Sequence, residues 1–433
     1  MADFDVIVVG AGVAGCTAAY KLASEGLEVL LVERASEPGS KNLSGGIFYG
    51  RVLPDLIPGF YDEAPIERRI TRNVIAFTRE GDAFNIDYSN RSYAGEGGEP
   101  ANGFSVLRAK LDMWLAEKAE EAGASLVPGI CVEDFVTEGG VVKGIVAVGE
   151  EMTADCVIVA DGINSKLTEK LGQRSGFGFH DMGVGVKYLY SLPEEVINDR
   201  FRCVSGEGVA YGIMGDVSEG IPGGGFLYTN QDTVSVGLVV HVDHLAESGK
   251  RPYDVLDHMV SNPEIAKLLE GAELVEYGAH MVAEGGAANL PASICGDGWM
   301  IVGDAAGFAA NNGFTVRGMD FAAMSGLLAA EAAIEAKARG DWSKAALASY
   351  QQKVDASFIK KDMDTYSDAP SFMKDERVYD ELVGMICSIF EGVYKQDGTP
   401  KRNMLSILLD AVKGSGLKFV QLGKLGLKAV RNL

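Results

Sequence analysis

Three glycines, Gly10, Gly12 and Gly15, follow the apolar run Val6–Val9 with the spacing G-x-G-x-x-G, and the next apolar run ends at Glu33. Glycines at this spacing permit a tight turn that brings backbone N–H groups close to a pyrophosphate at a helix N-terminus. An acid about 20 residues further on binds a ribose hydroxyl. A chain with 55 glycines contains many glycine-rich turns. Strand, triplet, helix, strand and acid in this order nevertheless predict a dinucleotide site.

A second motif lies late in the chain, where the apolar strand at 299–302 runs into Gly303-Asp304-Ala305-Ala306-Gly307. A flavin at the far end of a dinucleotide needs polar contacts to its ribityl chain and a helix N-terminus near the ring, whose dipole favours the reduced anion. Asp304 supplies the first, and the N–H groups near Asn312-Gly313-Phe314 are expected to face the O2/N1 edge. The other interpretation of Asp304 is a helix N-cap. Both motifs together predict FAD.

These residues need a framework, and the sequence predicts one of class α/β. A helix is expected at 105–123, with Leu107, Leu111, Leu115 and Ala119 on its buried stripe and Arg108 near its start. Buried strands are expected at 156–162 and 299–307, and a long apolar helix at 313–336. The predicted architecture is a Rossmann-type FAD-binding domain built from 1–60, 105–175 and 281–340.

The segments 61–104 and 176–280 differ in character, with alternating and glycine-punctuated runs such as Thr233–Val240. They predict a mainly antiparallel β-sheet domain inserted into the FAD-binding domain, on the side of the substrate. Residues 341–433 are expected to form a helical C-terminal region with a basic tail.

Composition limits the function. The chain has 433 residues, and its hydrophobic fraction of 47% excludes general disorder. The net charge of -22 argues against nucleic acid as a partner. The six cysteines include no C-x-x-C pair, and the five histidines show no ligand spacing, so no metal is expected. No leader or spanning segment is recognisable, which predicts a cytoplasmic protein.

The tail at 395–433 carries a net charge of +6 on an otherwise acidic protein, and leucines interleave with its lysines. Three interpretations stay open, in this order: leucines in a core with a solvated basic face, docking of a partner, and contact with a membrane surface. Gly414, Gly416, Gly423 and Gly426 weaken the last of them.

The order of GAGVAG, VER, SVLRAKLDMWL, ADGINS and GDAAGF resembles the glutathione-reductase-like FAD oxidoreductases, in the branch of aromatic hydroxylases and geranylgeranyl reductases. The segments KNLSGGIFYG at 41–50, LPDLIPGFYDEAPIERRIT at 53–71, GVGVK at 183–187, GGGFLYTN at 223–230 and GFTVRGMDFAAMSG at 313–326 are more specific. They resemble the FixC-type members of the electron-transfer flavoprotein:quinone oxidoreductase family, over nearly the whole chain.

The resemblance implies FAD as cofactor and an electron-transfer flavoprotein as electron donor. It implies that the first glycines hold the pyrophosphate, that Glu33 binds the adenosine ribose beside Arg34, and that residues 41–46 run along the isoalloxazine. No side chain is expected to be catalytic, because electron transfer needs no nucleophile or base. The expected cofactor-binding residues are Gly10, Gly12, Val13, Ala14, Gly15, Glu33, Arg34, Lys41, Asn42, Ser44, Gly45, Gly46, Arg108, Ala160, Asp161, Gly162, Gly303, Asp304, Gly307, Asn312, Gly313 and Phe314. For Lys41 and Arg108, a solvated surface charge is the alternative.

The chain departs from the mitochondrial-type members of this family, which append a four-cysteine iron–sulfur domain, whereas here only Cys387 follows Cys295. The resemblance to the FixC branch implies a separate ferredoxin-like iron–sulfur protein as partner, with quinone as the other acceptor. Contact at the inner face of the cytoplasmic membrane would accompany a quinone acceptor. Two alternatives remain: a flavin-dependent reductase or hydroxylase of an apolar small molecule, and a non-enzymatic binding protein that kept the nucleotide fold.

Overall fold

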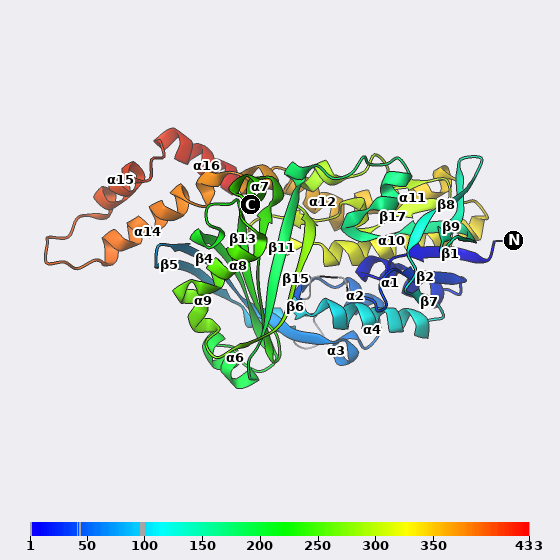
Figure 1. The fold of residues 1–433 in the computed structure, drawn as a ribbon, viewed down its shortest axis with the longest axis horizontal. Helices are drawn as coiled ribbons and strands as arrows, with labels where there is room; N and C mark the ends of the chain where they lie inside the picture. The colour runs from blue at the N-terminus through cyan, green and yellow to red at the C-terminus, as the bar shows by residue number, and fades with distance from the viewer. Residues whose placement is uncertain (1, 41, 43–44, 96–99, 433) are drawn as a thin grey trace.

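The computed structural model describes residues 2–40, 42, 45–95 and 100–432. Two large sheets, a small two-stranded hairpin and a set of C-terminal helices are the main parts of the described molecule, which is elongated (Figure 1). The sheet that holds the N-terminus lies at one end, the long strands of the second sheet lie in the middle, and α14 and α15 extend from the other end. This mixed α/β architecture agrees with the predicted Rossmann-type class.

The first sheet has the strand order β16-β17-β10-β1-β2-β7, and the pairs from β17 to β7 are all parallel. The segments at 6–9, 29–32 and 156–159 that pair at its centre are apolar and buried, as expected for parallel strands covered on both faces. The antiparallel pair β8–β9 joins the sheet through β10. The strands are β1 (Phe4–Val9), β2 (Val29–Glu33), β7 (Ser125–Pro128), β8 (Val132–Glu138), β9 (Val141–Ala147), β10 (Glu150–Val159), β16 (Cys295–Gly296) and β17 (Trp299–Ile301). In a parallel sheet the carboxyl ends share one edge, so the segments after β1, β2, β10 and β17 meet there.

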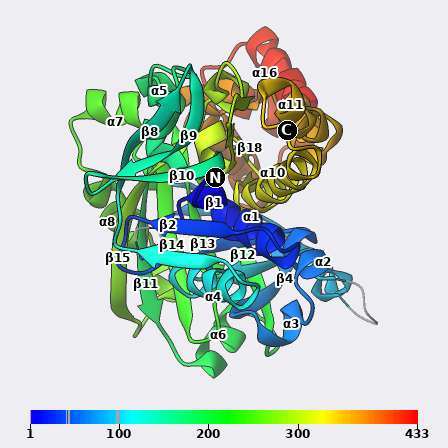
Figure 2. The same ribbon diagram turned by 90° about the vertical axis from the view of Figure 1, so that its right-hand side faces the viewer.

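Three helices, α1 (Val13–Ser24), α4 (Arg108–Glu121) and α10 (Met319–Arg339), pack together beside this sheet (Figure 2). Gly326 of α10 allows the closest approach, since a Cβ there would lie 2.2 Å from the Ala14 carbonyl oxygen of α1. The predicted leucine stripe of α4 is buried. The predicted start of α4 at 105 is wrong, because β6 (Gly103–Val106) continues to Val106.

The predicted start of α10 at Gly313 is also wrong. The helix begins six residues later, at Met319, because 310–317 form the small hairpin of β18 (Ala310–Asn311) and β19 (Val316–Arg317). The Asn312 side chain closes this hairpin by accepting hydrogen bonds from the N–H groups of Phe314 (3.0 Å) and Thr315 (2.8 Å). Asparagine side chains that bond to nearby backbone compete with helix formation in this way.

The second sheet has the order β15-β11-β14-β13-β12-β4-β6-β3, with β5 paired to β4. All its pairs are antiparallel except β4 with β12. It also includes β3, which precedes residue 61, where the inserted sheet was expected to begin. The strands are β3 (Gly46–Tyr49), β4 (Ile66–Arg79), β5 (Asp82–Ser89), β6 (Gly103–Val106), β11 (Met182–Ser191), β12 (Glu207–Gly215), β13 (Gly223–Thr229), β14 (Thr233–His241) and β15 (Glu273–Ala283).

Short helices complete these layers, and one face of the second sheet packs on those at 194–268 to form a separate apolar core. These helices are α2 (Val52–Leu56), α3 (Phe60–Glu63), α5 (Lys166–Lys170), α6 (Glu194–Phe201), α7 (Val242–Ser248), α8 (Pro252–Ser261) and α9 (Pro263–Leu268).

The C-terminal region is helical, as predicted. It contains α11 (Lys344–Ala356), α12 (Phe358–Thr365), α13 (Ala369–Met373), α14 (Glu381–Tyr394), α15 (Met404–Gly414) and α16 (Phe419–Asn432). Helix α14 rests on the second sheet through Phe390, whose ring stacks on Phe84 of β5 at 4.4 Å. In the described part of the chain, no helix is both long and apolar enough to cross a membrane.

Candidate functional site

Loops far apart in the sequence meet at the carboxyl edge of the first sheet. A Cβ added at Gly10 would lie 2.3 Å from the Ala160 carbonyl oxygen, so the turn after β1 touches the segment after β10. A Cβ added at Gly303 would lie 3.0 Å from the Cβ of Ala14 at the start of α1. The structure therefore brings three predicted segments together at the first turn of α1. They are GAGVAG at 10–15, ADGINS at 160–165 and GDAAGF at 303–308.

The two other glycines of the triplet have different roles. A Cβ at Gly15 would lie 1.9 Å from the Gly10 carbonyl oxygen, so this position must be glycine for the turn to close. At Gly12 a Cβ would meet only the Arg108 guanidinium, at 3.7 Å. The space over Gly12 is therefore not filled by protein, and a dinucleotide pyrophosphate at the N-terminus of α1 fits that space.

Glu33 is anchored at the same turn. Its carboxylate accepts one hydrogen bond from the Ala11 N–H (2.9 Å) and another from the Ala35 N–H (2.7 Å). These bonds join the end of β2 to the glycine-rich turn. The acid thus lies beside the pyrophosphate cradle, as its predicted part in ribose binding requires.

Arg108, the first residue of α4, is held by a buried acid that the sequence analysis did not single out. Its guanidinium donates to both carboxylate oxygens of Asp112, at 2.8 and 2.7 Å. Asp112 is completely buried and also accepts from the Asn42 side-chain amide at 2.6 Å. Burial works against the charge of Arg108, but Asp112 outweighs it and raises the pKa above the ordinary value. The i,i+4 spacing of Arg108 and Asp112 on a predicted helix was the signal that could have revealed this pair.

Asp304 lies in a single turn, 303–306, whose N-cap residue is Val302. The structure therefore does not support the alternative that Asp304 is the cap. Burial raises the pKa of its carboxyl, and the positive field of Arg108 acts in the opposite direction. A Cβ at Gly318, just before α10, would lie 4.0 Å from the Asp304 carboxylate, so this acid faces the N-terminus of α10. Gly307, with φ of +73°, ends the turn against the Asn289 carbonyl.

The loop before β3 connects the two sheets. Lys41 and Ser44, two of its predicted flavin contacts, lie outside the described residues. A Cβ at Gly45 would lie 2.4 Å from the Ser235 hydroxyl and 3.1 Å from the Lys187 ammonium, both on the second sheet. At Gly46 a Cβ would lie 3.0 Å from the Met319 methyl group. Gly45 therefore lies against the second sheet, and Gly46 lies beside the start of α10.

Lys187, from the GVGVK segment, was missed as a candidate residue. Its side chain is completely buried in β11, and burial lowers the pKa of its amine to about 7. A lysine in an otherwise apolar strand was the available signal.

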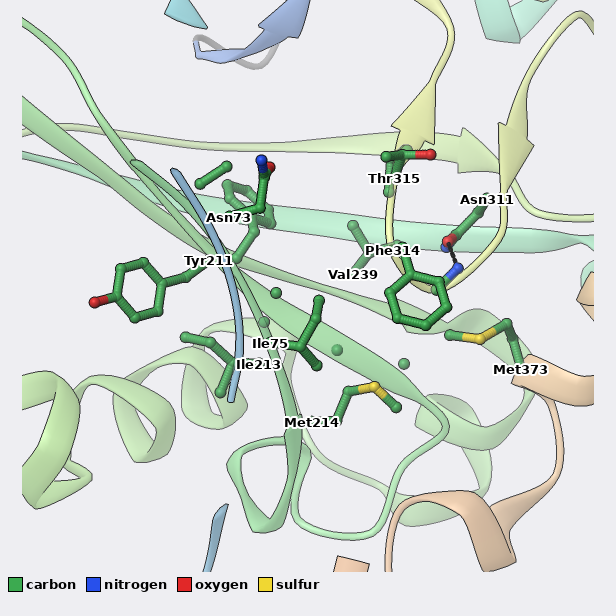
Figure 3. A pocket seen from close by; sticks show the side chains of 18 of the residues that line it. Asn73, Ile75, Tyr211, Ile213, Met214, Val239, Asn311, Phe314, Thr315 and Met373 are labelled. Carbon is green, nitrogen blue, oxygen red and sulfur yellow. Dashed lines mark hydrogen bonds between the residues drawn. The ribbon is translucent and has the colours of Figure 1, made fainter. Parts of the chain in front are cut away.

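Three predicted cofactor contacts lie in the hairpin before α10 rather than at its N-terminus. The N–H of Gly313 donates to the Asn311 side chain at 2.9 Å, and that of Phe314 donates to Asn312. In this structure the N–H groups expected at the flavin edge are thus bonded within the hairpin itself. Phe314 is 57% exposed and projects from the hairpin into the pocket described below (Figure 3).

Asp161 and Gly162 follow β10. One carboxylate oxygen of Asp161 accepts the Leu167 N–H at 3.0 Å and so holds the start of α5. Burial raises the pKa of Asp161 to about 6. This geometry is that of a residue supporting the loop.

A pocket lies between the second sheet and the 311–316 hairpin (Figure 3). Gly223, Gly224 and Gly225 of β13 line it together with apolar side chains of β4 and β12, and Met373 and Tyr379 of the C-terminal region also line it. Its empty space amounts to about 890 Å³ with the open mouth included. The pocket is mainly apolar. Among the described residues that line it, Glu284 alone carries a carboxyl group. Glu284 was also missed, because it follows a strand without a recognisable motif.

The described residues contain no cluster of His, Cys, Asp or Glu side chains that could hold a metal ion. All six cysteines are free thiols, and Cys16, Cys156, Cys295 and Cys387 are buried.

Comparisons with known proteins agree with this site. Residues 5–93 match the family model described as FAD dependent oxidoreductase, and residues 182–282 match the one described as ETF-QO, ubiquinone-binding. The chain is 43% identical to "Protein FixC" of Salmonella typhi over 99% of this chain and 98% of the relative. It is 41% identical to "Probable electron transfer flavoprotein-quinone oxidoreductase YdiS" of Escherichia coli strain K12, over 99% of each.

Among solved structures, a geranylgeranyl bacteriochlorophyll reductase-like protein from Thermoplasma acidophilum superposes with a TM-score of 0.71 at 22% identity, over 98% of this chain and 99% of that one. At this identity the likeness concerns the fold. Fold and site together define an FAD-dependent oxidoreductase with a Rossmann-type cofactor domain. More narrowly, the chain belongs to the FixC and electron-transfer flavoprotein–quinone oxidoreductase family. FAD as cofactor and the family predicted from the sequence are confirmed.

Proposed function

We propose that this protein accepts electrons from an electron-transfer flavoprotein at its FAD and passes them to a quinone bound in the pocket over the second sheet. Bound FAD supplies the redox chemistry, since it takes up and releases electrons. The chain's own residues hold it: Gly12 and the N-terminus of α1 receive the pyrophosphate, Glu33 the ribose, and Arg108 and Asp304 the middle of the dinucleotide. The names of the relatives and the matched ubiquinone-binding model support the choice of quinone.

The observation that carries the proposal is the position of the pocket. The 311–316 hairpin lines it, and the same segment leads through Gly318 to α10 and to the neighbourhood of Asp304. The hairpin that lines the pocket therefore leads directly to the residues that would hold the middle of the dinucleotide. The apolar walls and the stacked rings of Phe226 and Tyr228, 5.0 Å apart, suit a flat apolar headgroup.

The experiment compares two electron acceptors after anaerobic reduction of the FAD-loaded protein by a reduced electron-transfer flavoprotein. A short-chain ubiquinone requires the pocket, whereas ferricenium accepts electrons without it. Ile75→Phe fills the pocket and is expected to raise the KM for quinone about tenfold with ferricenium reduction unchanged. Ile86→Phe is the control, because Ile86 pairs with Ile75 across β4 and β5 but is 51% exposed and outside the pocket.

The rival activity, direct reduction or hydroxylation of an apolar molecule, gives a different result. Rapid reduction of the FAD by NADH or NADPH, with no response to the flavoprotein, would contradict our proposal. A protein that cannot be loaded with FAD at all would favour the binding-protein alternative.

A quinone acceptor dissolves in lipid, and we propose that the C-terminal arm, residues 395–432, touches the inner face of the cytoplasmic membrane. Exposed apolar side chains lie on α15 and α16, and those of α16 are interspersed with Lys424 and Lys428, as in interfacial helices. They are Met404, Leu405, Leu408, Leu409, Phe419, Val420, Leu427 and Val430. Of the other leucines in this arm, Leu417 and Leu425 are buried in a small core with Tyr379, so the prediction of core packing holds for these two.

Flotation with lipid vesicles tests this arm. The double variant Leu405→Glu/Phe419→Glu is expected to lose binding to vesicles containing anionic lipid, while Phe179→Glu, an exposed aromatic residue elsewhere, is expected to retain it. Equal flotation of all three proteins would contradict membrane contact through the arm.

A separate ferredoxin-like iron–sulfur protein is the second acceptor that we propose, docking on the lysines of the arm. The support is chemical: ferredoxins are acidic, and the tail is basic. Reversal of charge at Lys418 and Lys424 is expected to slow ferredoxin reduction at low salt and to leave ferricenium reduction unchanged. A salt-independent rate would contradict this docking.

A further inference from the structure

Reduction of a quinone to a quinol consumes two protons as well as two electrons, so the acceptor pocket needs a source of protons. Among the described residues that line it, the titratable side chains are Tyr49, Tyr211, Tyr228, Tyr379, His241 and Glu284. Burial raises the pKa of each tyrosine, which makes these hydroxyls poor acids. Burial lowers the pKa of His241 to about 4, so this ring is neutral at physiological pH. Glu284 remains.

Glu284 is placed to meet a ligand in the pocket. It directly follows β15, is 8% exposed, and its N–H donates to the Asp181 carbonyl at 2.9 Å. Gly183 on β11 makes room for its side chain, since a Cβ there would lie 3.0 Å from the Glu284 Cγ. His241 pairs with Gly183 in the sheet and so lies beside the same space. One Glu284 carboxyl oxygen accepts from the Asn311 amide at 3.2 Å, in the hairpin that carries Phe314.

A second, narrow cavity also reaches Glu284. Glu284 and Asn311 line both cavities, and the second one is otherwise formed by Ala283, Gly286, Ala309, Ala310, Met363, Tyr366 and Pro370. Gly286, Tyr366 and Pro370 are only partly buried, so this cavity approaches the surface between the hairpin and helices α12 and α13. A carboxyl group shared by a ligand pocket and a passage toward solvent is positioned to move protons between them.

We propose that Glu284 is the acid that protonates the quinone, and that the narrow cavity lined by Ala309 and Tyr366 returns its proton from solvent. This inference rests on the proposed function. In each step the O–H bond of the Glu284 carboxyl breaks and an O–H bond forms on a quinone oxygen, while the reduced cofactor supplies the electrons. The resulting carboxylate takes a proton from water, and a second cycle completes the quinol.

The charges around Glu284 are consistent with a proton that comes off near neutral pH. Burial raises the pKa of its carboxyl to about 7, against the Asn311 hydrogen bond and the positive field of Lys374, which lower it. Lys374 is itself paired with Asp181 at 3.2 Å. The neighbouring groups on the other packed elements are Tyr379 and neutral His241, and around His241 lie Asp243 and His244.

The test uses the full-length, FAD-loaded Glu284→Gln variant with the two acceptors, ubiquinone and ferricenium, from pH 5.5 to 8.5. Ferricenium takes up electrons without protons. We expect quinone reduction to fall about 100-fold, which lies within the range for loss of a general acid. We also expect its pH dependence near 7 to vanish and ferricenium reduction to stay within twofold of wild type. Glu273→Gln, an exposed acid on β15, is the matched control.

A second variant tests the passage without touching the acid. Ala309→Leu narrows the second cavity and is expected to slow quinone reduction, with an increased solvent isotope effect and unchanged ferricenium reduction. Wild-type quinone rates in Glu284→Gln would overturn the inference, as would equal losses with both acceptors. If the wild-type protein reduces ferricenium but no quinone at all, the proposed function fails and this inference fails with it.

Discussion

The Arg108 guanidinium and the Asp112 carboxylate, one helical turn apart, form a bidentate ion pair. Asp112 is completely buried and also accepts a hydrogen bond from the Asn42 side-chain amide. The pair lies under the glycine-rich turn, with Gly12 on one side and Asp304 near the other. Asp112 thus fixes, from within the core, two residues that the sequence predicts to bind FAD. Its contribution is positional, since it is shielded from any bound dinucleotide by the groups it orients.

Asp112→Asn is expected to weaken FAD binding about tenfold or more. The variant removes the charge that holds both guanidinium nitrogens, and a hydrogen bond to a charged group contributes about 1.5–3 kcal/mol. Quenching of flavin fluorescence gives the dissociation constant for FAD binding to the apoprotein. Asp55→Asn is the matched control, because Arg51 and Asp55 form the same i,i+4 pair at the surface, each side chain 58% exposed. Equal affinity of Asp112→Asn and wild type would show that Arg108 does not need this anchor.

Gly12→Ala and Gly15→Ala separate cofactor binding from folding. At Gly12 an added methyl group meets protein only at an ordinary contact distance of 3.7 Å, and φ of -84° is accessible to alanine. We expect the Gly12→Ala apoprotein to melt within about 2 °C of wild type, since the effect on the folded chain is below about 0.5 kcal/mol. We expect it to lose most of its FAD affinity.

Gly15→Ala places the methyl group 1.9 Å from a carbonyl oxygen and must displace α1. Melting temperature and FAD affinity are both expected to fall. A Gly12→Ala protein that binds FAD like wild type would contradict the position of the pyrophosphate over this turn.

Lys187 makes stability depend on pH in the alkaline range. Burial lowers the pKa of its amine from 10.5 to about 7. Between these pH values the amine is protonated in the unfolded chain and neutral in the folded chain. Stability is therefore fully present above pH 10.5 and falls as the pH drops toward 7. At about 1.4 kcal/mol per pKa unit, the loss is on the order of 5 kcal/mol. Denaturant titration of Lys187→Met apoprotein at pH 7 and pH 10 should show this slope removed. An unchanged slope would mean that other groups cause it.

Much of the cofactor edge could be predicted from sequence because its signals are local. The triplet at Gly10, the acid at Glu33 and the Gly303-Asp304 turn each follow an apolar strand, and parallel strands align their carboxyl ends. The start of α10 could not be predicted. The apolar composition of 313–336 is that of a helix, and the hydrogen bonds of Asn312 that hold 310–317 in a hairpin depend on side-chain orientation. Glu284 lacks a local signal, and the only local signal for Lys187 is its place in an otherwise apolar strand. What distinguishes both residues is burial by segments distant in sequence.

The stability of Glu284→Gln provides a check on the state of this carboxyl that is independent of any acceptor. Burial raises the pKa of Glu284 from 4.5 to about 7, so the folded chain holds a proton that the unfolded chain releases. The contribution to stability is fully present below pH 4.5 and is lost as the pH rises through 7, to a total on the order of 3 kcal/mol. Glutamine stays neutral, so the variant lacks this loss. The free energies of unfolding of the two apoproteins, measured by urea titration, should therefore agree most closely near pH 5. From there to pH 8 the variant should become increasingly stable relative to wild type. A constant difference between the two proteins over this range would mean that Glu284 is ionised throughout and is not the acid of the pocket.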